Sequence, residues 1–256
     1  MEMIFERTKG IEDVTTHYCP GCTHGIAHRL VAECLEEMNE LGNSIVAVPV
    51  GCAVLANKYF AFDSIQSAHG RAPATATAIK RVHPDKTVLT YQGDGDLASI
   101  GMAEIVHAAA RGEKITTIFI NNGIYGMTGG QMAPTTLPGM KTTTSQSGRD
   151  VNLQGYPIRV SEMLATLDGA KYIERVSLDS PTAIMKAKKA IRKAFEVQKA
   201  GLGFSLIEVI SSCPTNWGVT PVDAMKLIRE KMIPYYPLGI YKDTTKDSIK
   251  EEKADE

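Results

Sequence analysis

The chain has 256 residues, of which 43% are hydrophobic and 22% are charged, a composition typical of a folded globular protein and not of a disordered one. Its 28 Lys and Arg residues against 29 Asp and Glu residues leave a formal net charge of -1, without a basic cluster that could hold a phosphate backbone. Nucleic acid is therefore not an expected partner. No run approaches the ~20 apolar residues of a membrane helix, and the first ten residues are too charged for a signal peptide, so we expect a cytoplasmic protein without a membrane partner.

Apolar runs rich in Val, Ile and Phe alternate along the chain with amphipathic stretches. The expected strands are 44–50, 87–92, 115–120, 172–176 and 204–210, each short and mostly without alternation, as buried parallel strands are. The expected helices are 24–41, 72–82, 97–111, 161–167, 181–199 and 222–232. This βαβ rhythm predicts an α/β fold with an open, mainly parallel sheet and helices on both faces. In such folds ligands bind beyond the carboxyl ends of the strands.

One segment interrupts the rhythm. Residues 121–150 are rich in Gly, Thr, Pro and Ser and show no clear period, and loops of this length in compact domains are usually functional. Four apolar side chains can anchor it: Met127, Met132, Leu137 and Met140. The stretch 242–256 is charged and poor in apolar residues. We therefore predict one domain over 1–241 and a solvated, mobile tail over 242–256.

A glycine-rich turn follows the second expected strand, which runs into Gly93-Asp94-Gly95-Asp96 before a helix begins. Glycines in such a turn let backbone N–H groups approach a diphosphate at the helix N-terminus. This pattern alone also matches a dinucleotide site, so a nicotinamide-dependent dehydrogenase is the competing enzyme class. An aspartate between the glycines would repel a bare pyrophosphate, but it becomes useful when a divalent cation lies between carboxylate and phosphate.

The third expected strand ends in Asn121-Asn122-Gly123, where a dinucleotide site would need an acid for the ribose. An amide oxygen at that place instead completes a site for a hard cation. Mg²⁺ prefers octahedral oxygen ligands, which Asp94, the Asn122 side chain, a main-chain carbonyl, two diphosphate oxygens and a water would supply. The two motifs, about one βα unit apart, resemble the thiamine diphosphate signature. We therefore expect thiamine diphosphate and Mg²⁺ at this edge of the sheet.

Five cysteines occur, an odd number that argues against a disulfide framework. Cys19 and Cys22 form a Cys-x-x-Cys pair, whereas Cys52 follows the first strand and Cys213 follows the last. Both of these strand ends lie at the edge that carries the diphosphate turn. Four thiolates there suit one [4Fe–4S] cluster, with structural zinc and unligated thiols as alternatives. Cys34, inside a helical pattern, is expected to be a small core residue.

In their order along the chain, these motifs resemble those of the β subunits of 2-oxoacid:ferredoxin oxidoreductases. The resemblance extends to about residue 241 and rests on Cys19-Pro20-Gly21-Cys22, Gly51-Cys52, His69-Gly70-Arg71-Ala72, Gly93-Asp94-Gly95-Asp96, Asn122, Tyr125-Gly126-Met127-Thr128-Gly129-Gly130-Gln131 and Cys213-Pro214. It implies the pyrophosphate-type domain of the thiamine diphosphate-binding fold. It also implies oxidative decarboxylation of a 2-oxoacid to acyl-CoA and CO₂, with coenzyme A as a substrate and electrons passed through a [4Fe–4S] cluster to ferredoxin.

The resemblance also implies roles for individual residues. Four thiolates would hold the cluster: Cys19, Cys22, Cys52 and Cys213. Asp94, Asn122 and the carbonyl of Ile124 would bind Mg²⁺. Further contacts with the cofactor would come from Gly51, Gly70, Arg71, Gly93, Gly95, Asp96, Tyr125 and Gly126. Three residues would act in catalysis: His69, Met127 and Thr128.

The resemblance further implies partner subunits. The glutamate that activates thiamine in this superfamily lies on a second homologous domain, and this chain is too short to contain both. We therefore expect an α subunit that brings the glutamate, and a further small subunit or free ferredoxin for onward electron transfer. The loop 126–134 resembles that of members acting on branched-chain 2-oxoacids or 2-oxoglutarate, although Gly129 stands where some relatives have Lys.

One alternative is not an enzyme: a zinc-bound interaction subunit without chemistry of its own, which metal analysis would distinguish. His24 and His28 lie one helical turn apart, but Gly25 stands where a zinc-protease helix has glutamate. We expect these two histidines to be ordinary helix-face residues.

Overall fold

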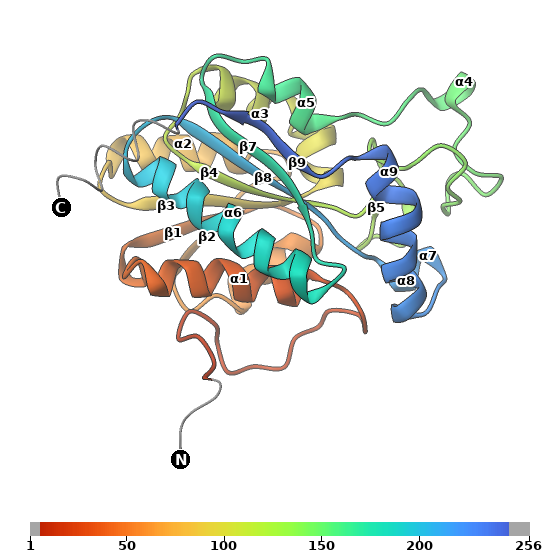
Figure 1. The fold of residues 1–256 in the computed structure, drawn as a ribbon, viewed down its shortest axis with the longest axis horizontal. Coiled ribbons are helices and arrows are strands. Elements are labelled where there is room, and N and C mark those ends of the chain that lie inside the picture. The colour runs from red at the N-terminus through yellow and green to blue at the C-terminus, as the bar shows by residue number, and fades with distance from the viewer. Residues whose placement is uncertain (1–5, 246–256) are drawn as a thin grey trace.

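The computed structural model describes residues 6–245, and a sheet of seven strands forms its centre (Figure 1). The strand order is β2-β1-β3-β4-β8-β7-β9. All pairings in it are parallel except that of β9 with β7. The strands are β1 (Ser44–Val48), β2 (Asp63–Gln66), β3 (Thr87–Gly93), β4 (Thr116–Asn121), β7 (Ala170–Ser177), β8 (Phe204–Ile210) and β9 (Gly239–Asp243). The predicted open, mainly parallel sheet is confirmed.

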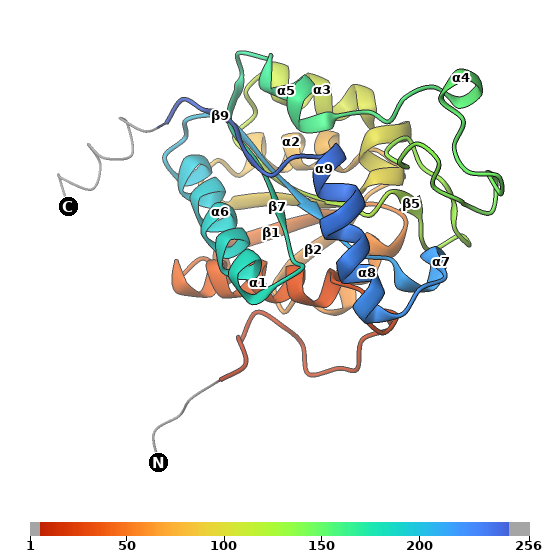
Figure 2. The ribbon, with the colours of Figure 1, turned by 45° about the vertical axis from the view of Figure 1, so that its right-hand side comes forward.

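Helices cover both faces of the sheet, as predicted (Figures 1 and 2). One face carries α1 (His24–Glu37) and α6 (Pro181–Lys199), and the other carries α2 (Ala72–Val82), α3 (Met102–Ala110) and α5 (Val160–Ala165). Shorter elements gather at one end of the sheet: the hairpin of β5 (Ile124–Tyr125) and β6 (Gln131–Met132), α4 (Val151–Gln154), α7 (Pro214–Trp217), α8 (Pro221–Leu227) and α9 (Ile233–Tyr235). Short 3₁₀ helices lie at Leu41–Asn43 and Cys52–Lys58.

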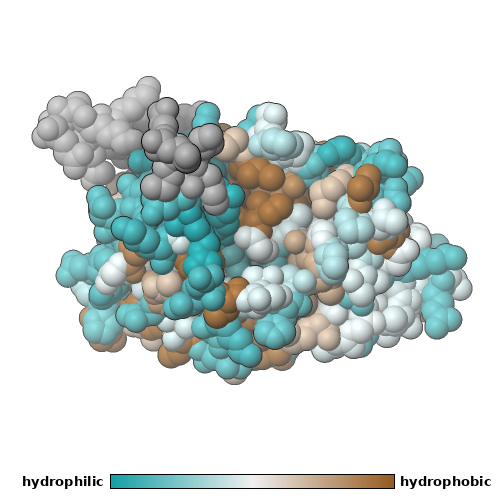
Figure 3. All heavy atoms as spheres, turned by 90° about the horizontal axis from the view of Figure 1, so that it is seen from below, coloured by the Kyte–Doolittle hydropathy of each residue, from teal (hydrophilic) through white to brown (hydrophobic). Residues whose placement is uncertain are grey.

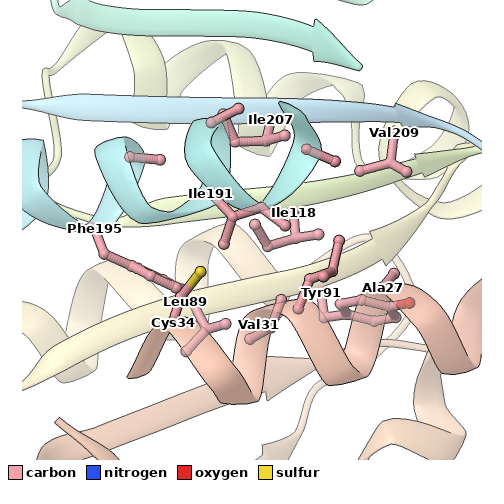
Figure 4. Packing of buried hydrophobic residues seen from close by; sticks show 14 of the residues in the cluster. Ala27, Val31, Cys34, Leu89, Tyr91, Ile118, Ile191, Phe195, Ile207 and Val209 are labelled. Carbon is pink, nitrogen blue, oxygen red and sulfur yellow. The ribbon is translucent and has the colours of Figure 1, made fainter. Parts of the chain in front are cut away.

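Local signals explain why α6 occupies its predicted bounds. The side chain of Ser180 accepts a hydrogen bond from the backbone N–H of Ala183, and Pro181 fits the first helical turn because its missing N–H needs no partner there. The buried stripe of the helix packs on α1 and on the sheet (Figure 4). Cys34 is completely buried in this layer beside Phe195, which confirms its predicted place in the core.

The predicted helix 97–111 is interrupted. A π-helical turn, Asp96–Ile100, precedes α3, and Ser99 in it has non-helical backbone angles (φ -115°, ψ -106°). The neighbouring loop explains the break, because its Gly70 packs directly on Gly101: a Cβ atom on Gly70 would lie 2.7 Å from the Gly101 nitrogen. This contact joins segments far apart in sequence, so helical periodicity could not reveal it.

The sequence did not reveal the two edge strands. All four residues of β2 are exposed, so the strand lacks the apolar pattern by which the inner strands are recognised. β9 returns antiparallel to β7 and includes Lys242 and Asp243, so the folded part of the chain extends past 241. The Asp243 carboxylate pairs with Lys193 of α6 and is almost fully buried. The remainder of the predicted tail, 246–256, lies outside the described residues.

The face seen in Figure 3 is mostly hydrophilic or neutral, with apolar residues in separate spots. Within residues 6–245, none of the helices has both the length and the hydrophobicity needed to cross a bilayer.

Candidate functional site

A cavity lies at the carboxyl edge of the sheet, where β1, β3 and β4 end. Most residues predicted to contact the cofactor or act in catalysis line it: Gly51, Cys52, His69, Gly93, Asp94, Gly95, Asp96, Asn122, Ile124, Tyr125, Gly126, Met127 and Thr128. Three further residues line it that were not predicted: His24, Val50 and Ala53. The topology therefore brings the residues of all three predicted oxygen ligands, Asp94, Asn122 and Ile124, and one predicted thiol, Cys52, to one cavity.

Asp94 follows β3 and is almost completely buried. Its Oδ2 accepts hydrogen bonds from the Gly123 N–H (2.6 Å) and the Thr135 hydroxyl (2.6 Å), whereas Oδ1 accepts one from the Gly95 N–H (2.8 Å). Burial raises the pKa of this carboxyl to about 6, against the opposing effect of those hydrogen bonds. A buried carboxylate without a cationic partner is costly, and a divalent cation would remove that cost.

Asn122 follows β4, the strand next to β3 in the sheet. Its side-chain oxygen accepts a hydrogen bond from the Ile124 N–H (3.2 Å), and its carbonyl accepts one from the Trp217 indole (3.2 Å). A Cβ atom on Gly93 would meet nothing within 4 Å, so the backbone there faces open space, close to the Asp94 carboxylate and the Asn122 side-chain oxygen. Carboxylate, amide and carbonyl oxygens beside such a glycine turn fit a hard cation that carries a diphosphate.

The Asp96 carboxylate has different contacts from that of Asp94, although both are buried in the same motif. Its carboxylate accepts hydrogen bonds from the His69 ring, the Gly70 N–H (2.6 Å) and the Gln92 amide (2.7 Å). These contacts fix the loop that carries His69 against the cavity. Asp96 therefore positions the loop, with its oxygens directed to protein groups.

Gly70 and Arg71 were predicted to bind the cofactor, but neither lines the cavity. Arg71 donates to the Ile100 carbonyl (3.0 Å) and pairs with Glu104 of α3 (2.7 Å). Gly70, with φ +75°, packs its backbone on Gly101. Both residues contact the π-helical turn or α3, and their predicted contacts with the cofactor stay predictions.

Replacing Gly70 by alanine should destabilise the fold by about 2–4 kcal/mol, because the new methyl group would be strained by the positive φ and would meet backbone atoms at 2.7 Å. Gly139→Ala is a matched control, because Gly139 has φ +73° and open space around it. Urea unfolding followed by circular dichroism measures both. Equal losses in the two variants would show that the contact with Gly101 contributes nothing.

The predicted cluster ligands converge beside the cavity. A Cβ atom on Gly126 would lie 3.4 Å from the sulfurs of both Cys52 and Cys213, so only glycine leaves this space between them open. Burial, with smaller contributions from repulsion by thiolates at Cys213, Cys52 and Cys19, raises the pKa of Cys22 to about 12. The Asn216 amide donates to the Cys213 sulfur (3.2 Å).

The two candidate metal centres, zinc and a [4Fe–4S] cluster, differ in how far apart they hold their thiolate ligands. A zinc ion holds all of its ligands about 2.3 Å from one centre. Among the described residues, no group of three or more His, Cys, Asp or Glu is arranged to hold a metal ion. In a [4Fe–4S] cluster each thiolate binds a different iron, so the sulfurs stand further apart around a larger body. The kind of metal centre that these thiolates hold stays a prediction.

His24, which was expected to be an ordinary helix-face residue, begins α1 and also lines the cavity. It is buried, and its Nδ1 shares a hydrogen bond with the Tyr91 hydroxyl (2.7 Å). The ring of Tyr18 stacks on it at 4.8 Å, and the Tyr18 hydroxyl donates to the Cys52 carbonyl (3.1 Å). Burial lowers the pKa of His24 to about 4, so the ring is neutral. Its position two residues after the Cys-x-x-Cys pair was a usable signal.

The long segment 121–150 is ordered, as expected, and hydrogen bonds from a buried arginine hold it in addition to two of the predicted apolar anchors. The guanidinium of Arg149 is buried and donates to the carbonyls of Pro134 (3.0 Å), Thr136 (2.7 Å) and Gly155 (2.9 Å). Leu137 and Met140 pack beneath the segment as predicted. Met127, expected to be an anchor, is instead 46% exposed, because it lies at the mouth of the cavity.

The parallel sheet and the glycine turn with its oxygen donors define a diphosphate-binding α/β domain of the thiamine type. The family of thiamine pyrophosphate enzymes, C-terminal TPP binding domain, matches residues 49–209. The ketoisovalerate oxidoreductase subunit VorA of Methanothermobacter marburgensis is 47% identical over 96% of this chain, which spans 51% of that relative. The 2-oxoglutarate synthase subunit KorB of Methanocaldococcus jannaschii is 38% identical over 84% of this chain and 78% of the relative.

A solved structure is also similar: the 2-oxoglutarate:ferredoxin oxidoreductase from Magnetococcus marinus with 2-oxoglutarate, coenzyme A and succinyl-CoA bound. It superposes with a TM-score of 0.78 at 25% identity, covering 94% of this chain and 86% of that one. The chain belongs to the β-subunit family of the thiamine pyrophosphate-dependent 2-oxoacid:ferredoxin oxidoreductases. The predicted family is confirmed, while the chain spans about half the length of the VorA relatives.

Proposed function

We propose that this chain is the cofactor-binding subunit of an enzyme that oxidatively decarboxylates a 2-oxoacid to acyl-CoA and CO₂. The observation that carries the proposal is that Asp94 and Cys52 line the same cavity. A cation–diphosphate site and an iron–sulfur site are useful together when carbon chemistry must release electrons singly. When bound, thiamine diphosphate would supply a nucleophile for the 2-oxo carbon and the cluster would accept the electrons for ferredoxin.

The chain's own residues would bind and orient these groups. Asp94, Asn122 and the Ile124 carbonyl would hold Mg²⁺, and the N–H groups of the glycine turn would face the diphosphate. Tyr125 packs on the backbone of Gly95, since a Cβ atom there would lie 2.4 Å from its ring. The Tyr125 ring would therefore sit beside the diphosphate.

Catalytic contacts would come from the cavity wall. His69 is held by Asp96, and the Thr128 hydroxyl donates to Gln131 (2.6 Å), so both side chains have fixed orientations. Met127 at the mouth would limit the access of water to the reacting atoms. His24, whose Nδ1 is held by Tyr91, would offer Nε2 as a further polar group.

The cluster would be held by Cys19, Cys22, Cys52 and Cys213. The alternative of structural zinc is less suited to the open space at Gly126. Asn216 would remain as a donor to the Cys213 sulfur, and such hydrogen bonds tune the reduction potential of a cluster.

The wall of the cavity favours a 2-oxoacid with an apolar side chain. Within the described residues, no lysine or arginine lines it, whereas Val50, Ala53, Ile124 and Met127 do. A second carboxylate, as in 2-oxoglutarate, would lose its hydration without a cation from this chain. Gly129, where some relatives have Lys, has φ +111° and adds no charge. A branched-chain acid such as 2-oxoisovalerate is therefore the proposed substrate, with 2-oxoglutarate second.

The enzyme would need partners. We propose an α subunit that carries the thiamine-activating glutamate and closes the open side of the cavity, with coenzyme A as the acyl acceptor and ferredoxin as the electron acceptor. Co-expression with the neighbouring reading frames tests this assembly. A chain that turns over 2-oxoacids alone would overturn the partner proposal.

Protein purified without oxygen tests the cofactors. We expect a brown preparation with about four irons per chain, as one [4Fe–4S] cluster requires, and Mg²⁺-dependent binding of thiamine diphosphate. Turnover of a panel of 2-oxoacids by the assembled complex tests the substrate, with branched-chain acids expected above 2-oxoglutarate. A colourless preparation that contains zinc would refute the cluster, and NADH binding would favour the dehydrogenase alternative.

Replacing one cluster ligand should remove the cluster without unfolding the sheet. Cys213→Ser should lower the iron content from about four per chain to near zero, because the serine oxygen is a poor ligand for this soft site. Far-ultraviolet circular dichroism should stay unchanged. Cys34→Ala is the control, because Cys34 is buried in the core under α6, and it should keep its iron. Full iron retention by Cys213→Ser would contradict the assignment.

A further inference from the structure

Thr135 is a buried residue of the segment between β6 and α4 that no motif singled out. Its hydroxyl donates to Oδ2 of Asp94 at 2.6 Å, and the side chain is completely buried. A hydroxyl–carboxylate bond of this length is charge-assisted and stronger than a neutral one. Asp94 and Thr135 are 41 positions apart, so the contact links the glycine turn to the long segment.

We propose that Thr135 is a positioning residue for the metal, holding the Asp94 carboxylate so that Oδ1 is the oxygen presented to the cation. The inference rests on the proposed function, in which Asp94 binds Mg²⁺. Thr135 itself does not line the cavity. It acts through Asp94.

The hydrogen bonds to the Asp94 carboxylate explain why Oδ1, and not Oδ2, would bind the cation. Oδ2 accepts from both the Thr135 hydroxyl and the Gly123 N–H, and a carboxylate oxygen has two lone-pair sites. Among the described residues, Oδ1 accepts one hydrogen bond of normal length, from the Gly95 N–H at 2.8 Å, so it is less occupied than Oδ2. Because Mg²⁺ demands near-ideal octahedral geometry, a carboxylate held in one orientation binds it better than one that rotates.

Thr135 is in turn fixed from two sides. The Tyr236 hydroxyl, directly after α9, donates to the Thr135 carbonyl (2.8 Å). The next residue, Thr136, is buried as well, and its hydroxyl donates to the Gly123 carbonyl (2.5 Å). The two threonines therefore bond to both parts of the site. Thr135 bonds to the Asp94 carboxylate, and Thr136 bonds to the turn that follows Asn122.

Metal binding by the cofactor-stripped, fully assembled complex tests the proposal. Mn²⁺ is titrated in the presence of thiamine diphosphate, and free Mn²⁺ is followed by electron paramagnetic resonance. Thr135→Val keeps the shape and removes the hydroxyl, so the Mn²⁺ dissociation constant should rise about 10–100-fold. Thr135→Ser keeps the hydroxyl and should restore most of the affinity.

A matched variant separates positioning from a general loss of stability. Thr90→Val removes a buried hydroxyl of β3 that donates to the Thr117 hydroxyl (3.1 Å) and not to Asp94, so Mn²⁺ affinity should stay at the wild-type value. If Thr135→Val does not fold, Thr135→Ala is titrated in its place, with the same rise expected. Unchanged Mn²⁺ affinity in a folded Thr135 variant that lacks the hydroxyl would overturn the inference.

Two further Mn²⁺ titrations test the proposed function separately from the role of Thr135. Asp94→Ala should lose Mn²⁺ binding at this site, and if it does while Thr135→Val binds normally, only the positioning role fails. If wild-type protein shows no Mn²⁺ binding that depends on thiamine diphosphate, the proposed function fails and the inference with it.

Discussion

Asp94→Ala should abolish Mg²⁺-dependent binding of thiamine diphosphate, weakening it by more than about 100-fold, since even groups that only orient a metal ligand contribute about 10–100-fold. The carboxylate is the one anionic oxygen that this chain itself contributes to the proposed ligand set, and its negative charge offsets the cost of bringing Mg²⁺ into the protein. Calorimetric titration of the cofactor-stripped complex with thiamine diphosphate, with and without Mg²⁺, measures the effect.

Asp96→Asn is the matched control for Asp94→Ala. Both carboxylates are buried and they are two positions apart, but the oxygens of Asp96 are occupied by His69, Gly70 and Gln92. Its replacement should loosen the loop that carries His69 while leaving the dependence on Mg²⁺ in place. Because Asp94→Ala leaves three donors without a partner, far-ultraviolet circular dichroism must show an intact fold. Wild-type affinity in folded Asp94→Ala would refute the metal role.

The layers of the fold were predictable because their causes are local or periodic. Both α2 and α6 occupy their predicted bounds, and each has a proline in its first turn. The inner strands β1, β3, β4 and β8 are mostly apolar and almost fully buried because they are covered on both faces. β2 and β9 were not predicted, because a strand at the edge of a sheet does not need a continuous apolar run.

The site was predictable where parallel strands end together. The Asp94 and Asn122 motifs follow β3 and β4, which are neighbours in the sheet, so topology alone brings them to one cavity. That these residues bind the cofactor stays a prediction. The contacts of Thr135 and Arg149 could not be predicted. Thr135 bonds to a carboxylate far away in the sequence, and Arg149 bonds to main-chain carbonyls that come together only in the folded segment.

Arg175→Met should destabilise the fold by about 3–5 kcal/mol, the cost of leaving a buried charge without its partner. The Arg175 side chain is completely buried, with Nε 2.9 Å from Oε2 of Glu208, which is completely buried as well. The guanidinium also pairs with Glu162 of α5 (2.5 Å) and lies 4.7 Å from the centre of the Tyr241 ring. The carboxylates of Glu208 and Glu162 raise the pKa of Arg175 against the effect of burial, so the group stays charged.

The methionine variant would leave Glu208 with only the Ser161 hydroxyl (2.5 Å) and the Asn121 amide (2.8 Å) as partners in the core. Urea unfolding followed by circular dichroism measures the loss. Arg192→Met is the control, because Arg192 is 46% exposed and pairs with Glu37 at the surface (3.2 Å), a contact worth about 1 kcal/mol or less. Adding Glu208→Gln to Arg175→Met should recover part of the stability, because it removes the uncompensated charge. If the double variant is as unstable as the sum of the two single changes, lost packing around the Arg175 side chain is the cause and the buried charge is not.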